Sequence, residues 1–250
     1  MGLPRTFRRS GRLDLILEHR LYIVRTPANE TAGRGSMAKS ENIPVPAVRR
    51  LSLYLRQLEA FNEDNRTTVS SRELGEALAL SDAQVRKDLA CFGQFGHPGI
   101  GYRVPELIQQ VRRILGTDRI SHVLLVGAGN LGRALIAFRG FAKRGFELVA
   151  VFDKDAAKIG EMTGGPNAIR IQPLSEMPAT VRKHAIRVGI LAVPAAAAQQ
   201  AAEEMVVAGI RGILNFAPVT LQVGAEVEGA SVDLAIHLEQ LSFQVSGSPA

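Results

Sequence analysis

The residues with the most specific chemistry form one glycine-rich hexapeptide, Gly127-Ala128-Gly129-Asn130-Leu131-Gly132. It follows the apolar run 122–126, which is typical of a buried parallel strand, and precedes a segment with helical spacing of apolar residues. In this context the first glycine allows a tight turn, the second lets backbone N–H groups approach a pyrophosphate, and the third lets helix and strand pack closely. The helix N-terminus also favours negative charge. The hexapeptide therefore predicts a dinucleotide-binding loop.

An acidic residue follows at the spacing that this kind of site requires. The apolar run 148–152 ends at Asp153, 21 residues after Gly132. A carboxylate there can accept hydrogen bonds from both hydroxyls of the adenosine ribose and repels a 2′-phosphate. We therefore expect NADH/NAD⁺ as the ligand rather than the NADP pair, a preference that the neighbouring Lys154 weakens slightly.

Two later apolar runs supply further candidate contacts, because ligands of doubly wound sheets bind at the carboxyl ends of strands. These cofactor candidates are Ala192, Val193, Pro194, Asn215, Ala217 and Pro218. Ordinary loop structure explains each of them about equally well.

A pair of short helices is predicted upstream, because a serine followed three residues later by Glu or Gln occurs twice. In the second helix, Ser81 is the cap and Gln84 its reciprocal partner. Apolar residues share one face of this helix, and the other faces carry Gln84, Arg86, Lys87 and Asp88. The pattern is typical of a helix-turn-helix, in which Arg and Lys reach guanine edges or phosphates in the major groove. Ser81, Gln84, Arg86 and Lys87 are therefore the candidate DNA contacts of this helix. Ordinary solvated helix charges are the alternative, and the two caps favour DNA binding.

A glycine-rich segment follows this helix pair. Four glycines fall within residues 93–101, interleaved with Phe and Ile and followed by Tyr102. Glycines permit a sharply bent backbone, and the apolar residues indicate that it packs against the domain. We interpret the segment as the wing of a winged helix, with a flexible interdomain loop as the alternative.

Length and composition predict two globular domains, since 250 residues of which 46% are apolar can bury two modest cores. We expect a disordered basic extension over 1–42, a winged-helix DNA-binding domain over 43–116, a Rossmann-type doubly wound parallel sheet over 117–230 and a C-terminal amphipathic helix over 231–250. The fold class is therefore α/β. The apolar face of the last helix fits either its own domain or a second subunit.

Several classes of protein are excluded or disfavoured. No apolar run reaches the roughly 18–20 residues that span a membrane. The single cysteine, Cys91, excludes an internal disulfide, disfavours a cysteine-based zinc site and fits a reducing cytoplasm. We interpret Cys91 as a small buried side chain, with a thiol redox switch as the alternative, and we expect no metal.

The net charge of +6 is concentrated in the N-terminal extension, where residues 1–37 hold seven Arg and three acidic residues. Residues 117–250 hold twelve basic and twelve acidic residues. The total charge is therefore not itself a sign of DNA binding. A targeting peptide and a DNA-clamping arm are alternatives for this extension, but we favour a disordered segment that precedes a working start at Met37.

These segments together resemble the bacterial redox-sensing transcriptional repressor family Rex. The resemblance covers about residues 43–245 and is carried by Val85–Leu89, Phe92–Gly96, Gly99–Tyr102, Gly127–Gly132, Phe152–Asp153, Gly212–Pro218 and Val232–Leu234.

The resemblance implies a homodimer with a domain-swapped C-terminal helix. It implies a palindromic operator that is bound when NADH is scarce and released when NADH fills the Rossmann sites. Arg86 and Lys87 would read bases in the major groove, and the wing, with His97 and Gly99, would contact the minor groove. An interdomain polar triad that senses the ligand would include Arg56 and Asp233.

Two positions depart from the family pattern. Where the triad usually has Tyr, this chain has Phe138, which has no hydroxyl and puts the triad's switch in doubt. Where the wing usually carries basic residues, this chain has His97-Pro98, so the minor-groove contact is weaker or falls to His97.

Two other functions remain as alternatives. An NAD-dependent dehydrogenase with a small helical cap would need a proton donor near the nicotinamide, but the five histidines stand in no evident His–Asp or Lys-based arrangement. We therefore expect no catalytic residue. A coenzyme A-binding domain shares a similar nucleotide fold but would not explain the winged helix.

Overall fold

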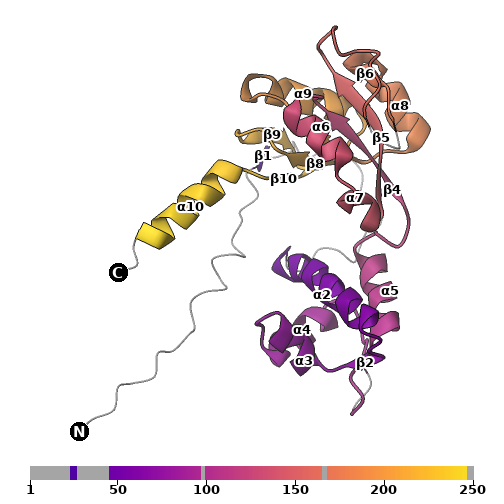
Figure 1. The fold of residues 1–250 in the computed structure, drawn as a ribbon, viewed down its shortest axis with the longest axis vertical. Coiled ribbons are helices and arrows are strands. Elements are labelled where there is room, and N and C mark those ends of the chain that lie inside the picture. Colours follow the sequence, from indigo (N-terminus) through magenta and orange to yellow (C-terminus); the bar gives the residue numbers. More distant parts are fainter. Residues whose placement is uncertain (1–22, 27–44, 97–98, 165–167, 247–250) are drawn as a thin grey trace. The chain divides into compact units, whose positions relative to one another are not determined.

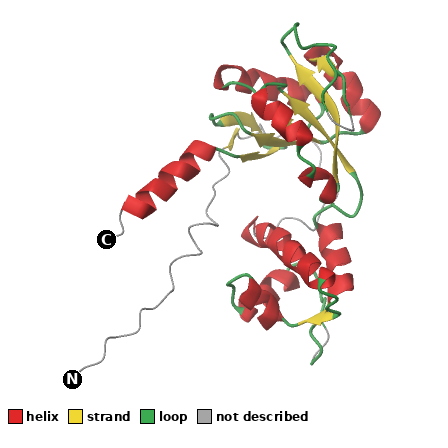
Figure 2. Cartoon of the chain, in the orientation of Figure 1, coloured by secondary structure: helices red, strands yellow, loops and turns green. Residues whose placement is uncertain are grey.

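The structure is a computed structural model, and it describes residues 23–26, 45–96, 99–164 and 168–246. The chain divides into two compact units, with the break after Arg119. A short strand from the N-terminal extension belongs to the second unit. The first unit is mainly helical, whereas strands and helices alternate in the second (Figure 2).

Among its described residues, the first unit has four helices and one small ladder. Its elements are α2 (Val45–Glu63), β2 (Thr68–Val69), α3 (Ser71–Ala77), α4 (Asp82–Ala90), β3 (Tyr102–Arg103) and α5 (Val104–Ile114) (Figure 1). Strands β2 and β3 pair antiparallel, so β3 brings the glycine-rich segment back beside the start of α3. The core includes Leu51, Leu58, Leu74, Leu89 and Val111. At the start of α2, Ala47 is buried in the inward position and Val48 is 40% exposed.

The two predicted caps differ in the structure. Ser70 forms the full capping box, in which its hydroxyl accepts from the Glu73 N–H at 3.1 Å and its own N–H donates to the Glu73 carboxylate at 2.8 Å. Ser81 accepts from the Gln84 N–H at 3.1 Å, but the Gln84 side chain donates to Asp88 instead of returning to the cap. The predicted reciprocal half of the second box is therefore wrong.

The second unit is built on a six-stranded parallel sheet with the order β10-β8-β7-β4-β5-β6. Its strands are β4 (Ser121–Val126), β5 (Phe146–Asp153), β6 (Ile171–Pro173), β7 (Val188–Leu191), β8 (Gly212–Asn215) and β10 (Glu228–Ser231). Chain order runs outward from β4 on one side and then from β7 on the other, which is the strand order of a Rossmann fold. The topological switch point, where the strand order reverses, lies between β4 and β7. The glycine-rich loop starts at the carboxyl end of β4, beside this point.

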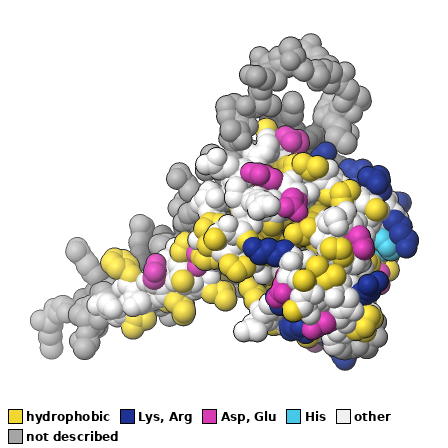
Figure 3. Space-filling model, turned by 90° about the horizontal axis from the view of Figure 1, so that it is seen from above, with side chains coloured by type: hydrophobic (Ala, Val, Ile, Leu, Met, Phe, Trp, Pro, Cys, Tyr) yellow, Lys and Arg dark blue, Asp and Glu magenta, His cyan; other side chains and the backbone are white. Residues whose placement is uncertain are grey.

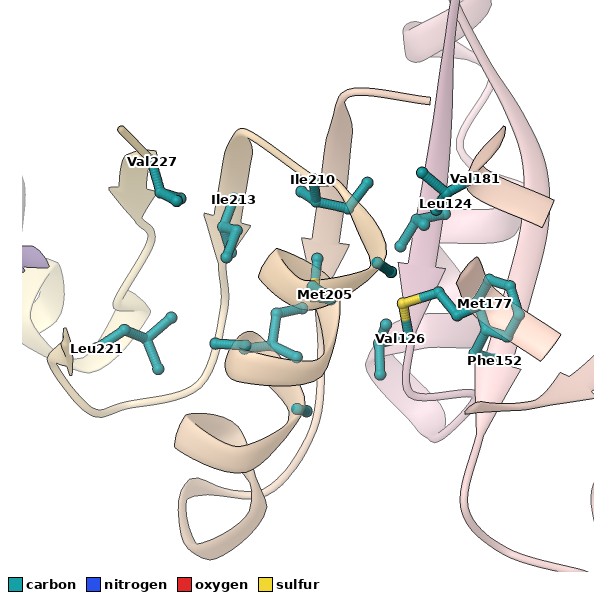
Figure 4. Close-up of a cluster of buried hydrophobic side chains, with 14 of the residues drawn as sticks. Leu124, Val126, Phe152, Met177, Val181, Met205, Ile210, Ile213, Leu221 and Val227 are labelled. Carbon is teal, nitrogen blue, oxygen red and sulfur yellow. The ribbon is translucent and has the colours of Figure 1, made fainter. Parts of the chain in front are cut away.

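Helices cover both faces of this sheet. On one face, α8 (Met177–His184) and α9 (Ala195–Ala208) pack against alternate strand residues, including Leu124 and Phe152 (Figure 4). On the other face, α6 (Asn130–Ala137) and α7 (Gly140–Lys143) pack over Leu125 and Val151. A short 3-10 helix, η1 (Leu174–Glu176), leads into α8. The sheet is buried on both sides, so its strands read as continuous apolar runs.

A separate pair of parallel strands lies in the second unit. β9 (Leu221–Gly224) pairs with β1 (Ile23–Thr26), in register from Ile23 opposite Leu221 to Thr26 opposite Gly224. The sequence predicted disorder over 1–42, which is wrong for the four residues of β1. The rest of that extension lies outside the described residues.

The C-terminal helix α10 (Leu234–Ser246) has an uncovered apolar surface in this single chain. Leu234, Leu238, Leu241 and Phe243 are each more than half exposed, and hydrophobic side chains are visible along the helix (Figure 3). The described residues include no helix that is long and apolar enough to cross a membrane. Cys91 is exposed at the end of α4, so its interpretation as a buried filler is wrong.

Candidate functional sites

Two glycines of the hexapeptide are required by the fold itself. Gly127 has a φ of +103°, and a Cβ there would lie 2.3 Å from the carbonyl oxygen of Ala192. A Cβ on Gly132 would lie 1.9 Å from the carbonyl oxygen of Gly127. The first glycine lets β4 turn beside β7, and the third lets α6 return over the loop.

Gly129 is different, because a Cβ there would meet no atom within 4 Å. Its φ is −76°, which any residue adopts, so the ligand-free fold has no need for glycine here. Gly129 caps α6, and no side chain caps the first N–H groups of that helix. An open space above free N–H donors at a helix N-terminus fits an anion that approaches the backbone closely. These residues therefore fit a dinucleotide pyrophosphate.

A cavity of about 660 Å³ opens beside this loop. Of the predicted cofactor residues, the cavity is lined by Gly127, Gly129, Asp153, Lys154, Ala192, Val193 and Pro194. It is also lined by Asp155, Ala156 and Lys158 in the turn after β5, by Leu174 of η1, and by Ala197, Gln200, Ala201 and Glu204 of α9. Its size lies within the usual range of small-ligand pockets, and the loop, the acid and the switch point meet in it.

Asp153 is held in its charged form at the end of β5. One carboxylate oxygen accepts from the Ala128 N–H at 2.8 Å, and the other accepts from the Asp155 N–H at 2.9 Å. Lys158 Nζ lies 3.3 Å from the first oxygen and 3.4 Å from Asp155. Burial raises the pKa of Asp153, but these backbone donors and the Lys158 ammonium outweigh it and hold the pKa below its usual value. The carboxylate is therefore ionised and fixed against the glycine loop.

The second candidate site is the exposed face of α4 in the first unit. The Arg86 side chain is about half exposed and donates to Asp82 at 2.6 Å and to the Ser71 hydroxyl at 3.1 Å. Lys87 is exposed beside it. Arg86 also borders a hollow of about 490 Å³ whose opposite wall is the glycine-rich segment, including Gly99. A cation between a helix face and a wing suits contact with a nucleic-acid groove or backbone.

Comparison with known proteins identifies the family. A family model described as a CoA binding domain matches residues 118–219, and one described as a putative DNA-binding protein N-terminus matches residues 42–90. The redox-sensing transcriptional repressor Rex of Carboxydothermus hydrogenoformans is 46% identical over 207 residues, which cover 83% of this chain and 98% of that protein. The protein of the same name from Brevibacillus brevis is 43% identical over 211 residues, or 84% and 100% of the two chains.

The chain belongs to the Rex family of redox-sensing transcriptional repressors. Among solved structures, the Rex-family repressor RSP in complex with β-NAD⁺ and operator DNA matches with a TM-score of 0.76 and 34% identity, over 81% of this chain and 92% of that one. RSP in complex with β-NADH matches with a TM-score of 0.72 and 32% identity, over 82% and 95%. The winged-helix and Rossmann predictions are confirmed. A CoA-binding domain alone does not account for the first unit, and the Rex relatives are repressors rather than enzymes.

In this Rex chain, the end of β8 does not line the cavity. Asn215 is fully buried, and its amide donates to the carbonyl oxygens of Ala217 and Val219 and to Ser231. Its Oδ1 accepts from the Ala217 N–H at 2.9 Å. Asn215 thus closes its own turn, and Pro218 is exposed outside the cavity lining. The assignment of Asn215, Ala217 and Pro218 to the cofactor remains a prediction.

Within the hexapeptide, four residues do not line the cavity, and one of them is Gly132, which is buried against the backbone of Gly127. Ala128 is buried and contributes the N–H that holds Asp153, whereas Asn130 and Leu131 are exposed in the first turn of α6. Lys158 was not among the predicted cofactor residues, although it lies only five residues after Asp153 in the sequence. Gln200 and Glu204 gave no local signal, because only the packing of α9 turns one of its faces toward the cavity.

Asp88 corrects the prediction for α4. It was expected on an outer face, but it is 2% exposed and accepts hydrogen bonds from Arg50 and Tyr54 of α2. Gln84, predicted to contact DNA, is half-buried and donates to Asp88 at 2.7 Å. The described wing residues include Gly99, which is exposed, whereas His97 lies outside the described residues.

The three predicted switch residues have separate local environments. Arg56 is exposed on α2 in the first unit. In the second unit, Phe138 is 57% exposed with its ring edge-on to Phe141 at 5.1 Å. Asp233 caps α10 by accepting from the N–H groups of Ala235 and Ile236 at 2.9 and 3.3 Å. Their assembly into an interdomain triad stays a prediction.

Proposed function

We propose that this protein represses transcription in response to NADH. It binds a palindromic operator through α4 and the wing when NADH is scarce, and it releases the operator when NADH occupies the cavity beside the glycine loop. The decisive observation is that one Rex-family chain carries both an exposed Arg86 face and an open cavity with an ionised Asp153. The RSP structures with operator DNA and with NADH support both halves of the proposal.

The nucleotide acts as a ligand and is not consumed. The N-terminus of α6 and Gly129 bind the pyrophosphate, and Asp153 accepts from the adenosine ribose hydroxyls. Its negative charge, together with that of Asp155, disfavours a 2′-phosphate, whereas Lys158 partly offsets this repulsion. NAD⁺ binds the same cavity, but it shifts the protein less strongly toward the released state.

Release requires NADH to bind one state of the protein more tightly than the other. A ligand with equal affinity for the DNA-competent and the released state would shift nothing, however tightly it bound. We propose that NADH favours a dimer whose two α4 helices no longer match half-sites about one helical turn apart.

A homodimer follows from the palindromic operator and from α10. The exposed apolar side chains of α10, including Leu238 and Phe243, need cover in water, and a second copy of the chain supplies it by exchange of this helix. The protein acts in the cytoplasm, where bacterial operators lie.

Fluorescence anisotropy tests the function. A labelled operator, selected from random duplexes, is titrated with the protein at fixed salt and then with NADH, NAD⁺ or NADPH. We expect release by NADH, weaker release by NAD⁺ and little release by NADPH. Asp153→Ala should bind the operator but lose the response, and Arg86→Ala should lose operator affinity while still binding NADH. Operator binding that ignores all three nucleotides would reject redox control.

A further inference from the structure

A buried polar cluster joins the DNA-facing helix to the helix behind it. The Asp88 carboxylate of α4 accepts four hydrogen bonds. Arg50 donates from Nε at 2.5 Å and from Nη2 at 2.7 Å, the Tyr54 hydroxyl donates at 2.6 Å, and Gln84 Nε2 donates at 2.7 Å. Asp88 is 2% exposed and Tyr54 is fully buried. The carboxylate thus has a donor for each of its roughly four acceptor positions.

The protonation states of Asp88, Tyr54 and Arg50 agree with their hydrogen bonds. Burial raises the pKa of Asp88, but hydrogen bonds from Arg50, Tyr54 and Gln84 outweigh it and keep the pKa below its usual value. Burial and the Asp88 hydrogen bond raise the pKa of Tyr54, which therefore stays a neutral donor. The charge on Asp88 is balanced by Arg50, whose two parallel N–H bonds fix direction as well as distance.

The apolar contacts of α4 alone define its orientation poorly. Its nine residues place only Val85 and Leu89 in the apolar core, on one narrow stripe. Successive residues on a helix are about 100° apart. A rotation by one position would therefore bring either Lys87 to the buried place of Asp88 or Arg86 to the buried place of Val85, depending on its direction. Hydrophobic contact is non-directional, whereas a bidentate Arg–carboxylate contact is formed at only one rotation of the helix about its axis.

We propose that Asp88, held by Arg50 and Tyr54, is a positioning residue that fixes the rotation of α4 so that Arg86 and Lys87 face DNA. This inference rests on the proposed DNA-binding function of α4. The same contact holds Gln84 against Asp88, which removes its amide from base reading. A buried ion pair adds little net stability compared with apolar residues of similar volume, so its main contribution here is the choice of one arrangement.

The test measures discrimination rather than stability. The affinity ratio between the selected operator and a random duplex of equal length is determined by anisotropy for the wild-type protein, Asp88→Asn and Arg50→Lys. Arg50→Lys retains the charge but loses the two-pronged geometry. We expect both variants to lower the ratio at least about tenfold, by weakening operator binding more than random-duplex binding, since a rotated helix loses base contacts but keeps phosphate contacts. Tyr54→Phe, which removes one donor and keeps the ring, should lower the ratio less.

A matched control is the ion pair between Glu59 of α2 and Arg112 of α5, at 2.9 Å. Glu59→Gln removes a charge from the same helix without touching α4, and it should leave the ratio unchanged. NADH binding reports that the second unit is intact, and thermal unfolding reports the cost in stability. A lowered melting temperature with an unchanged ratio in Arg50→Lys and Tyr54→Phe would overturn the inference and leave the cluster a purely stabilising contact. A wild-type protein with no preference for any duplex would instead reject the proposed function.

Discussion

Among the described residues, each unit buries one charged aspartate, but the two units surround it with different hydrogen-bond donors. Asp88 in the first unit receives its hydrogen bonds from three side chains, two of them on another helix. Asp153 in the second unit receives them from two backbone N–H groups and from Lys158, all at the edge of a cavity. In both cases hydrogen bonds outweigh burial, and the pKa lies below its usual value.

The difference is between a carboxylate whose partners all belong to the fold and one that lines a cavity. The four hydrogen bonds that Asp88 accepts fill its acceptor positions, so its interactions are complete within the protein. Asp153 is fixed by backbone donors that keep their positions if the side chain changes, and one side of it faces open space. Removing Asp88 should therefore damage the structure, whereas removing Asp153 should damage binding.

Asp88→Ala should have the largest effect on stability. The substitution removes the acceptor of the buried Tyr54 and of Arg50, whose side chain is 13% exposed. Loss of one partner of a buried ion pair costs about 3–5 kcal/mol of unfolding free energy. Denaturant unfolding of the full chain measures this loss in the first unit. Asp82→Ala, an exposed acid on the same helix, is the control and should cost much less. Equal losses for the two variants would show that Asp88 is not specially coupled to α2.

Asp153→Ala should act mainly on the ligand. We expect NADH affinity to fall about 10- to 100-fold, which corresponds to about 1.4–2.7 kcal/mol, because the ribose hydroxyls lose their acceptor. NADPH should lose less, since the same change removes a charge that repels its phosphate. Isothermal titration measures both ligands, with Glu226→Ala, an exposed acid of the same unit, as the control. An unchanged NADH affinity would remove Asp153 from the ribose site.

Gly129→Ala sharpens the contrast within the hexapeptide. The added methyl enters open space in the ligand-free chain, so unfolding free energy should change by less than about 1 kcal/mol. It also occupies the place where a pyrophosphate approaches, so NADH affinity should fall about tenfold, or about 1.4 kcal/mol. Gly164→Ala, also in open space but outside the cavity lining, should change neither quantity. Full NADH affinity in Gly129→Ala would place the pyrophosphate elsewhere.

The meeting of the glycine loop and Asp153 at one cavity was predictable, because the signals for both are local. The hexapeptide and Asp153 lie 21 residues apart, within one strand–helix–strand unit whose geometry is fixed by the chain. Asp88 was misplaced for the opposite reason: its main partner, Arg50, lies 38 residues away on another helix. A charged residue on a predicted surface helix is normally exposed, and only tertiary contact reveals an exception.

Other differences have the same origin. The short strands β6, β9 and β10 hold three or four residues each and carry no long apolar run, so periodicity gave no sign of them. β1 pairs with a strand almost 200 residues away, which no local pattern reveals. Asn215 sits at the carboxyl end of a strand, as a ligand contact would, but its amide is fully used within its own turn.

Lowering the pH should remove the contribution that each of the two buried carboxylates makes to the stability of the fold. Because the pKa of each is lower in the folded chain than in the unfolded one, where it is about 3.9, each stabilises the fold above that pH. The contribution is lost as the pH falls through the lowered folded value. Asp88→Asn and Asp153→Asn should each flatten the loss of stability between neutral pH and acid, measured by denaturant midpoints. An unchanged slope in both would contradict the assigned charge states.

Gln84→Ala should have the smallest effect on DNA recognition. If Gln84 read an adenine with its amide, its loss would cost about 1–3 kcal/mol at one base position. Its amide is instead committed to Asp88, so we expect the base preference at every operator position to change by less than about 0.5 kcal/mol. Unfolding free energy should still fall by about 0.5–1.5 kcal/mol, because one hydrogen bond of the cluster is lost. Anisotropy over a set of single-base operator variants measures the preference, and Arg86→Ala is the positive control that should relax it. If Gln84→Ala relaxed the base preference at one operator position, Gln84 would have to leave Asp88 when DNA binds. The Asp88 carboxylate would then have a free acceptor position in the DNA-bound state. In that respect it would resemble Asp153 more than the free chain suggests.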